Sequence, residues 1–321
     1  MPTNPIHALL ETVPFAVVDG ALATELERHG CDLNDSLWSA RVLAEQPELI
    51  TRVHRDYFEA GADITITASY QATFEGFMAR GMSEAQAGAL IARSVSLACE
   101  ARDAFWADYA GPMRPRPLVA ASVGPYGAYL ADGSEYRGGY AIDEEALMAF
   151  HRPRIKALVE AGADLLACET LPSLVEAKAL VRVLAEFPEA QAWVTFSARD
   201  GHHISEGTPI AECATWLDQQ PQVVAMGVNC TALEHIESLL TDLRAHTCTP
   251  LLVYPNSGEV YDPITKTWRA AEAGECGHHE SAFTTLVPLW RQAGASLIGG
   301  CCRTGPDDVR AIAALRDAST A

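Results

Sequence analysis

The feature that most constrains the fold is a segment that occurs three times along the chain. Residues 59–70 (EAGADITITASY), 160–171 (EAGADLLACETL) and 292–302 (QAGASLIGGCC) share one pattern. In each copy a helix-like stretch ends at a glycine, the residue that most readily adopts the left-handed conformation after a helix. A short apolar run follows at once. We therefore expect three strands that each begin directly after a helix.

Five further apolar runs bring the number of predicted strands to eight. They are FAVVDG, PLVAASVGP, AWVTFS, VVAMGVNC and PLLVYPNSG, at 15–20, 117–125, 192–197, 223–230 and 250–258. Nearly continuous apolar runs are typical of parallel strands that are buried on both faces. The segments between them have helical periodicity. In residues 47–61, for example, Pro47 suits the first turn of a helix and Gly61 suits its end.

Eight strands that alternate with helices predict an α/β fold, a (β/α)8 TIM barrel, with residues 1–321 as a single domain. A doubly wound open sheet is the alternative that the sequence leaves open. A barrel carries its functional residues at the C-terminal ends of the strands. Acids, hydroxyls, amides and thiols do stand where the apolar runs stop, namely Asp19, Thr67, Ser69, Ser122, Glu169, Ser197, Asn229, Cys230, Asn256, Cys301 and Cys302.

Three cysteines at two of these strand ends indicate a metal site. Successive residues of a regular strand point to opposite faces, but the glycines before Cys301 and the RTG sequence after Cys302 let both thiols turn to one point. With Cys230 they would form a set of three thiolates, which favours zinc and leaves a fourth, catalytic position open. Spacing alone leaves two alternatives, packing of each cysteine in the core and a strained disulfide between Cys301 and Cys302.

The composition narrows the expected partners and compartment. The chain has 42 acidic and 23 basic residues, a net charge of −19, which argues against nucleic acid or an anionic membrane and suits a cationic small molecule. The N-terminal sequence shows no secretion signal, and no apolar run approaches the roughly 18 residues of a membrane span. We therefore expect the nine cysteines to be thiols in a reducing compartment and the protein to be cytoplasmic.

Several blocks of the chain carry a resemblance to a known family. The specific blocks are GVNC (227–230) and LIGGCCRT (297–304), supported by VVDGALATELERHG, TITASYQATFEGF, SVGPYGAYLADGSEYRG, LLACETLPS and VYPNSGE. Together they resemble the homocysteine S-methyltransferase family, most closely the S-methylmethionine–homocysteine methyltransferases, from about residue 15 to residue 312.

The resemblance implies a (β/α)8 barrel that binds Zn²⁺ through the three cysteines, with the sulfur of homocysteine in the open position. It implies that Asp19 and Glu169 pair with the ammonium group of homocysteine. Further substrate-binding residues carry over as Thr67, Ser122 and Asn229. The small-molecule partners are then homocysteine and a methyl donor, and the sequence identifies no protein partner.

The chemistry implied is methyl transfer from a sulfonium compound to the thiolate of homocysteine, a step of methionine biosynthesis. Zinc coordination deprotonates a thiol that is otherwise mostly protonated at neutral pH. The donor is S-methylmethionine or S-adenosylmethionine, and the sequence does not decide between them. The insertion at 126–140 has tyrosines and acids that suit a cation, so it is either a lid or donor loop, or an ordinary exposed loop. Residues 254–268 have the same two interpretations.

A second class of function would use the same thiols without turnover. A zinc-storage or redox-sensing protein on a barrel scaffold has no use for an ammonium pocket, so Asp19 and Glu169 favour the enzyme. Related barrels take methyl groups from betaine or a methyl-corrinoid. A single domain leaves no room for a corrinoid or folate module, and this disfavours a methyl-corrinoid as the donor.

The remaining cysteines and the paired histidines are not predicted to form a site. Adjacent histidines lack the ligand spacing of known metal sites, so His202–His203 and the group Cys276, His278 and His279 are expected to be loop residues. Cys168 precedes Glu169, and strand alternation should turn it away from the site. Packing is the expected role of Cys31, Cys99, Cys213 and Cys248.

Overall fold

The structure is a computed structural model, and it describes residues 4–31, 38–111, 114–258, 260–262, 267–269 and 282–319. Eight strands form one sheet in the order β1-β10-β7-β6-β5-β4-β3-β2, and neighbouring strands are parallel. Each lies within one of the predicted apolar runs, so all eight strand predictions are confirmed. The strands are Ala16–Val17 (β1), Ile64–Ile66 (β2), Leu118–Val123 (β3), Leu165–Leu171 (β4), Ala192–Phe196 (β5), Val223–Asn229 (β6), Leu251–Tyr254 (β7) and Ala295–Ile298 (β10).

The sheet closes on itself, which decides between the two folds that the sequence left open. β1 and β2 stand at the two ends of the strand order, and they meet through a parallel bridge between Val18 and Ile64. The Asp63 amide donates to the Val17 carbonyl at 2.7 Å, and the Asp19 amide donates to the Ile64 carbonyl at 3.0 Å. A doubly wound sheet keeps two free edges. The chain is therefore a (β/α)8 barrel in a single domain.

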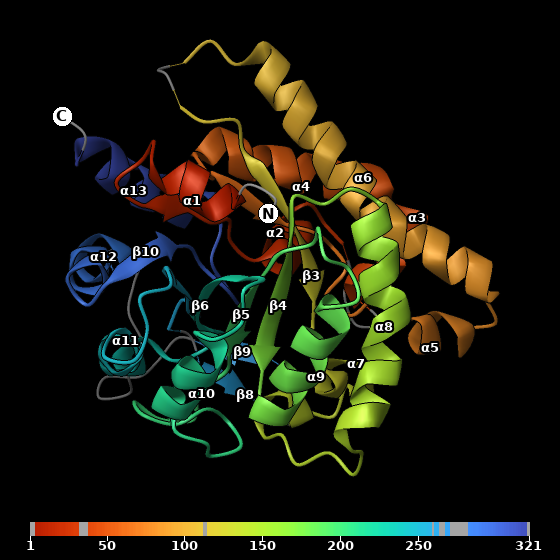
Figure 1. The fold of residues 1–321 in the computed structure, drawn as a ribbon. Helices are drawn as coiled ribbons and strands as arrows, with labels where there is room; N and C mark the ends of the chain where they lie inside the picture. The colour runs from red at the N-terminus through yellow and green to blue at the C-terminus, as the bar shows by residue number, and fades with distance from the viewer. Residues whose placement is uncertain are drawn as a thin grey trace.

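Helices cover the outside of the barrel, as Figure 1 shows. The longer ones are α3 (Trp38–Glu45), α4 (Pro47–Ala60), α6 (Glu84–Asp108), α8 (Glu144–Glu160), α9 (Leu174–Leu184), α10 (Ile210–Leu217), α11 (Ile236–Arg244), α12 (Ala282–Gln292) and α13 (Pro306–Ala318). The shorter ones are α1 (Pro5–Leu10), α2 (Leu22–Arg28), α5 (Phe74–Met78), α7 (Tyr126–Leu130) and the 3-10 helices η1 (Ser134–Tyr136) and η2 (Leu233–His235). A separate antiparallel hairpin consists of β8 (Val260–Asp262) and β9 (Thr267–Arg269). None of the helices in the described part of the chain combines the length and the apolar character that a membrane crossing requires.

The repeated junction of helix, glycine and strand is present in all three predicted copies. Gly61, Gly162 and Gly294 have φ angles of 110°, 84° and 106°, in the left-handed region. At Gly61 a Cβ atom would also stand 2.6 Å from the Cβ atom of Ala313 in α13. Glycine is therefore required there for its backbone conformation and for the space that its missing side chain leaves.

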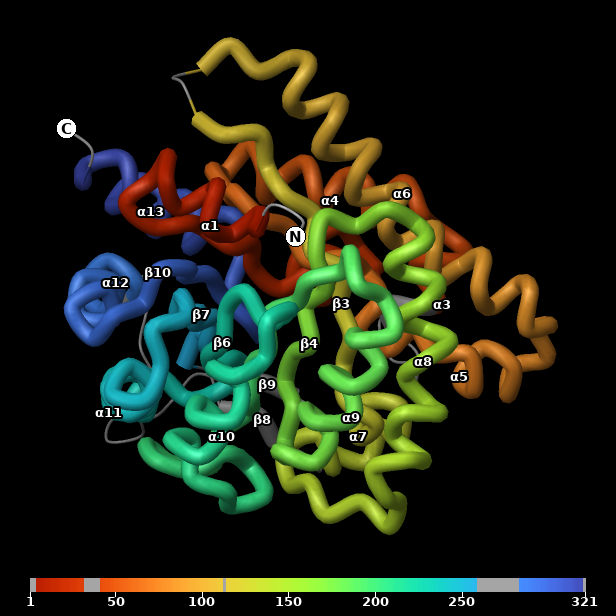
Figure 2. The backbone as a smooth tube through the Cα atoms, viewed as in Figure 1, coloured from red at the N-terminus to blue at the C-terminus, as the bar shows by residue number. Residues whose placement is uncertain are grey.

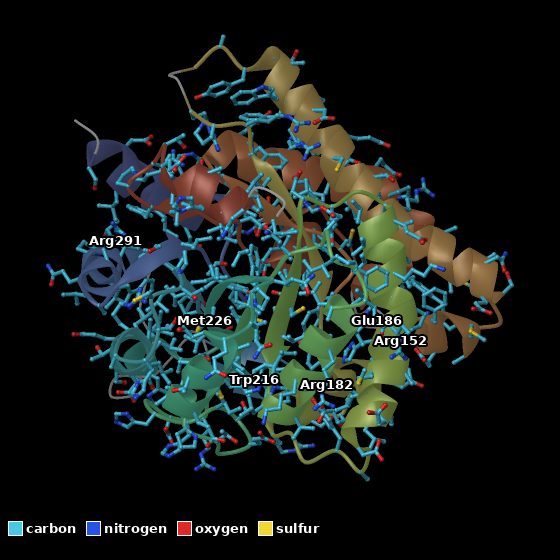
Figure 3. The ribbon with its side chains drawn as sticks, in the orientation of Figure 1. Arg152, Arg182, Glu186, Trp216, Met226 and Arg291 are labelled. Carbon is cyan, nitrogen blue, oxygen red and sulfur yellow. The ribbon has the colours of Figure 1, made fainter. Side chains whose placement is uncertain are left out.

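The core has two layers, one inside the barrel and one between the strands and the helices. Ala167, Trp193 and Leu252 belong to the inner layer, which Ile6 and Leu9 of α1 join at one end. Met226 of β6 belongs to the outer layer. In Figure 3, Arg152 of α8 lies beside Glu186, which follows α9, and the two side chains form an ion pair at 2.9 Å on the outer surface.

A buried aspartate ties the N-terminal end of the barrel together. Asp63, just before β2, is fully buried, and its carboxylate accepts a hydrogen bond from the Val17 amide at 2.9 Å. Arg316 of α13 pairs with it at 2.6 Å and Arg114 at 3.0 Å. Two guanidinium groups therefore compensate this charge, at the end of the barrel opposite to the one where functional residues are expected.

Candidate metal centre and active site

The three predicted zinc ligands lie together at the C-terminal end of the barrel. Cys230 directly follows β6, and Cys301 and Cys302 follow β10; these two strands flank β7, as Figure 2 shows. The three sulfur atoms lie within 4.8 Å of one another, and those of Cys230 and Cys302 are 3.8 Å apart. Zinc–sulfur bonds of about 2.3 Å in tetrahedral geometry separate two sulfurs by about 3.8 Å. The spacing of Cys230 and Cys302 therefore matches that of two zinc ligands, and the third sulfur lies close to both.

The backbone beyond β10 leaves the regular strand, which is how two adjacent thiols reach the same point. At Gly300 a Cβ atom would stand 2.4 Å from the Thr304 hydroxyl, so only glycine fits the turn. The Cys301 amide then donates to the Pro255 carbonyl at 2.7 Å. Hydrogen bonds from Cys230 and Cys301 lower the pKa of the Cys302 thiol well below its usual value. The three thiols therefore act as one group, in which Cys302 ionises most readily.

Asp19, at the end of β1, is a buried carboxyl group that has no cationic partner among the described residues. Its Oδ2 atom accepts hydrogen bonds from the Thr65 hydroxyl at 2.6 Å and from the Ile66 amide at 2.8 Å. Burial raises the pKa of Asp19 to about 8, although these two hydrogen bonds oppose the shift and the charge of Glu169 adds to it. A cation arriving here would find a carboxyl group that gains from ionising beside it.

Glu169, in β4, is the second buried carboxyl group of the site. The Ser122 hydroxyl of β3 donates to its Oε1 atom, and the Tyr254 hydroxyl of β7 donates to its Oε2 atom at 3.0 Å. Burial raises the pKa of Glu169 to about 7, against the effect of both donors. Two neighbouring acids in this state form a pocket suited to a substrate ammonium group.

Thr67 and Ser69 support Ser122 from the neighbouring strand end. The Ser122 amide donates to the Thr67 hydroxyl oxygen at 3.0 Å, and the Ser69 hydroxyl donates to the Ser122 carbonyl at 2.8 Å. The two hydroxyls are 2.7 Å apart, so Thr67 donates to Ser69. All three residues are buried. Together they fix the position of the hydroxyl that holds Glu169.

Asn229 is fully buried and its amide is engaged by other residues of the protein. Its Oδ1 atom accepts hydrogen bonds from the Thr170 amide and the Thr195 hydroxyl, both at 2.8 Å, and its Nδ2 atom donates to the Thr170 hydroxyl at 2.8 Å. Thr170 has a φ angle of 59°, a conformation that a β-branched residue rarely adopts. Asn229 thus holds the strained residue that directly follows Glu169.

The insertion at 126–140 approaches the thiols. It folds into α7 and η1, and the Tyr136 hydroxyl of η1 lies 3.9 Å from the sulfur of Cys230. The Glu135 backbone carbonyl accepts a hydrogen bond from Ser197, at the end of β5, at 3.0 Å. Burial raises the pKa of Glu135, and the nearby charges of Asp132 and Cys230 add to this. Of the two interpretations of this insertion, the structure favours the one in which it borders the site.

Two residues with evident roles escaped the sequence reasoning. Tyr254 is the last residue of β7 and Thr65 lies inside β2, so both were counted with the apolar strands. Asn256 was a strand-end candidate, and its Oδ1 atom is buried without a partner among the described residues. An aromatic hydroxyl at the last position of a buried strand is the signal that could have identified Tyr254.

The residues set aside in the sequence lie apart from the thiols where they are described. Cys168 is in the outer core layer, away from Glu169, as strand alternation predicts. His202 and His203 pair with Asp242 and Asp200 near the surface. The group Cys276, His278 and His279 lies outside the described residues.

A second group of ligand-type side chains lies between α2 and α4. The ligand atoms of Glu25, His29 and Asp56 lie within 4.8 Å of one another. Arg52 pairs with Asp56 at 2.8 Å, and Arg28 pairs with Glu25 at 3.2 Å. Because guanidinium groups already neutralise both carboxylates, we interpret this group as an ion-pair network.

Comparison with known proteins places this site in a family. The family profile for homocysteine S-methyltransferase matches residues 16–316. The chain is 62% identical over 312 residues to homocysteine S-methyltransferase YbgG of Bacillus subtilis, with 97% of each chain covered. It is 55% identical to homocysteine S-methyltransferase of Escherichia coli, covering 97% of this chain and 98% of that one. The metallated form of the homocysteine methyltransferase MmuM from Escherichia coli superposes with a TM-score of 0.87 and 52% identity, covering 97% of this chain and 100% of that chain. The chain therefore belongs to the homocysteine S-methyltransferase family of enzymes.

Proposed function

We propose that this enzyme transfers a methyl group from a sulfonium compound, S-methylmethionine or S-adenosylmethionine, to homocysteine, and so forms methionine. The observation that carries the proposal is the convergence of three thiols on one point at the barrel mouth. The two buried carboxyl groups of Asp19 and Glu169 lie at the same end of the barrel. We further propose that residues 1–321 act as one homocysteine-binding domain.

The metal in this proposal is Zn²⁺, held by Cys230, Cys301 and Cys302. The donor set supports it, because three thiols gathered within 4.8 Å suit zinc better than harder ions. The metallated form of the similar MmuM enzyme points in the same direction. Bound zinc would keep the thiol of homocysteine ionised at neutral pH, where a free thiol is mostly protonated.

Asp19 and Glu169 would bind the ammonium group of homocysteine. Both carboxyl groups are biased toward the neutral form by burial, and a cation between them restores the charged form. Homocysteine binding should therefore release protons. Ser122, supported by Thr67, orients Glu169, and Asn229 shapes the backbone beside it, so we assign these three residues to the substrate pocket.

The transfer itself needs no acid from the protein. The thiolate sulfur of homocysteine attacks the methyl carbon, and a new carbon–sulfur bond forms as the old one breaks. The electron pair of the broken bond goes to the donor sulfur, which leaves as a neutral thioether. The protein's contribution is to hold the two sulfurs in line with the methyl group between them.

An assay of methyl transfer with parallel metal analysis tests the proposal. Reduced, zinc-loaded protein is given homocysteine with S-methylmethionine, S-adenosylmethionine or betaine. We expect methionine from a sulfonium donor and about one zinc per chain. Cys230→Ala should lose both, whereas Cys213→Ala, which removes a thiol of the outer core, should lose neither. Zinc binding without methionine from any donor would instead support a storage or sensing role.

The thiol state bears on the compartment that we propose. All eight described cysteines are free. A zinc site of three thiolates functions only while the thiols are reduced. We therefore propose a reducing compartment, the cytoplasm, as the place of action.

A further inference from the structure

We propose that Glu135 and Tyr136, on η1, form the subsite that binds the positively charged sulfur of the methyl donor. The inference rests on the proposed function, because it assigns a place to the sulfonium which that function requires. The family comparisons and the zinc ligands leave this side of the site unassigned.

Tyr136 stands at the rim of the thiol group. Its hydroxyl lies 3.9 Å from the sulfur of Cys230, yet 40% of the residue is exposed. The residue therefore contacts the thiols and is also open to solvent. A cation within about 6 Å of the face of a tyrosine ring is attracted by the negative π-surface. The ring is thus placed to line the path by which a cationic donor approaches the thiols.

Glu135 supplies the charge that a sulfonium needs. Its Oε2 atom is buried and has no hydrogen-bond partner among the residues that the structure describes. Arg137, two residues away, donates to the Asp132 carbonyl instead of pairing with Glu135. A buried carboxyl oxygen without a partner is costly unless a ligand compensates it. A sulfonium carries no hydrogen-bond donor on its sulfur, so such an oxygen can meet it through charge alone.

The wider site also favours a cation. Within the described part of the chain, Asp19, Glu135 and Glu169 take part in no ion pair with lysine or arginine. The proposed thiolates add further negative charge. A low-dielectric pocket of this sign attracts cations and repels anionic methyl donors.

η1 is held in place before any donor arrives. The Ser197 hydroxyl donates to the Glu135 carbonyl at 3.0 Å, and the Gly138 amide donates to the Ser134 carbonyl at 2.8 Å. Gly127 lets η1 approach α7, since a Cβ atom there would stand 2.4 Å from the Glu135 nitrogen. A preorganised subsite loses little entropy when its ligand binds.

The chemistry predicts how the loss of Glu135 would affect the kinetics. The donor sulfur is fully charged in the ground state and loses that charge as the methyl group leaves. Glu135 therefore stabilises the bound donor at least as much as the transition state. Its removal should raise the KM for the donor with little change in kcat. The neutral thioether product no longer attracts the carboxylate, which favours its release.

Three variants test the assignment. Glu135→Gln removes the charge at constant shape, Tyr136→Leu removes the ring, and Asp132→Asn is the control, because it removes an exposed acid of the same segment. We expect Glu135→Gln to raise the donor KM about 10- to 100-fold, the usual effect of losing a buried charge partner. Tyr136→Leu should raise it by a smaller factor. The homocysteine KM, the zinc content and the thermal midpoint should match those of the wild type and of Asp132→Asn.

Binding of tetramethylammonium gives a readout that does not depend on turnover. This cation resembles a sulfonium in shape and charge but has neither an amino nor a carboxyl group. We expect calorimetry to show binding to the wild type that Glu135→Gln weakens about 10-fold or more. Unchanged binding together with an unchanged donor KM would overturn the assignment, as would an equal rise in the KM of both substrates. If the wild type forms no methionine from any sulfonium, the proposed function fails, whatever the cation binding shows.

Discussion

Asp19→Asn should stabilise the substrate-free protein at alkaline pH while it abolishes homocysteine binding. Asparagine keeps the shape of the side chain, and its oxygen can still accept the hydrogen bonds from Thr65 and Ile66. The substitution therefore removes only the charge that Asp19 acquires on ionisation. No described cation compensates that charge, so its removal relieves a cost.

The size of the effect follows from the pKa. Burial raises the pKa of Asp19 from 3.8 to about 8. Because the pKa of Asp19 is higher in the folded protein than in the unfolded chain, protonation of Asp19 stabilises the fold. This stabilisation is fully present below about pH 4 and is lost as the pH rises toward 8. At about 1.4 kcal/mol for each tenfold change, the full difference is roughly 5–6 kcal/mol. Because a buried site relaxes around a charge, we expect about 2–3 kcal/mol at pH 8 and none at pH 4.

Urea unfolding of the reduced protein in the presence of a chelator, at pH 4 and pH 8, measures this difference. Asp63→Asn is the matched control, because Asp63 is also buried but pairs with Arg114 and Arg316. Its loss deprives two largely buried guanidinium groups of their shared carboxylate and should cost about 3–5 kcal/mol at both pH values. If Asp19→Asn instead lowers the stability at pH 8, Asp19 is charged and compensated in the free protein, and the reasoning is wrong.

Two further variants and one treatment test Tyr254, a buried network of Arg154, His151 and Glu176 on α8 and α9, and the proposed metal. Tyr254→Phe removes one of the two donors to Glu169, so the pKa of Glu169 should rise above about 7 and the KM for homocysteine should rise about 10-fold at pH 7, but less at pH 9. Arg154→Met leaves buried Glu176 without the cation that reaches it through His151, and it should lower the free energy of unfolding by about 3 kcal/mol in urea titrations. Removal of the proposed zinc by a chelator should lower the thermal midpoint, and about 3 kcal/mol should return when zinc is restored to 100 times its dissociation constant.

The fold could be predicted from the sequence because its strongest signals are local. A strand buried on both faces must be apolar along its whole length, so eight such runs are visible without knowledge of their partners. The junction glycines are visible for a similar reason, since the left-handed backbone at Gly61, Gly162 and Gly294 strongly favours glycine. The sequence left open whether the sheet closes into a barrel. Closure depends on contacts between β1 and β2, whose paired residues are 46 positions apart in the sequence.

The candidate site could be predicted only in part. A barrel brings all strand ends to one face, so the rule that places function there picks out Asp19, Glu169 and the cysteines without any distance. The partners of these residues are a different matter. Tyr254 reaches Glu169 across the barrel from a strand 85 residues away, and nothing local marks that contact. The fold of the insertion around Tyr136 likewise depends on Ser197, which is far away in the sequence and donates to the Glu135 carbonyl. It also depends on Gly127, whose missing side chain lets η1 pack against α7.

Backbone strain explains why local patterns fail at this site. Four described residues other than glycine have positive φ angles, and three of them lie at the site. Thr170 follows Glu169, Cys230 directly follows β6, and Arg303 follows Cys302. Each such conformation costs on the order of 1–3 kcal/mol and persists only where surrounding contacts impose it. The Asn229 amide supplies three such contacts, two with Thr170 and one with the Thr195 hydroxyl of β5. The positions of the carboxyl group and the thiols are therefore set by tertiary packing against the local preference of the chain. Asn229, whose amide imposes this backbone through its protein partners, should for that reason be as sensitive to substitution as the carboxyl group and the thiols.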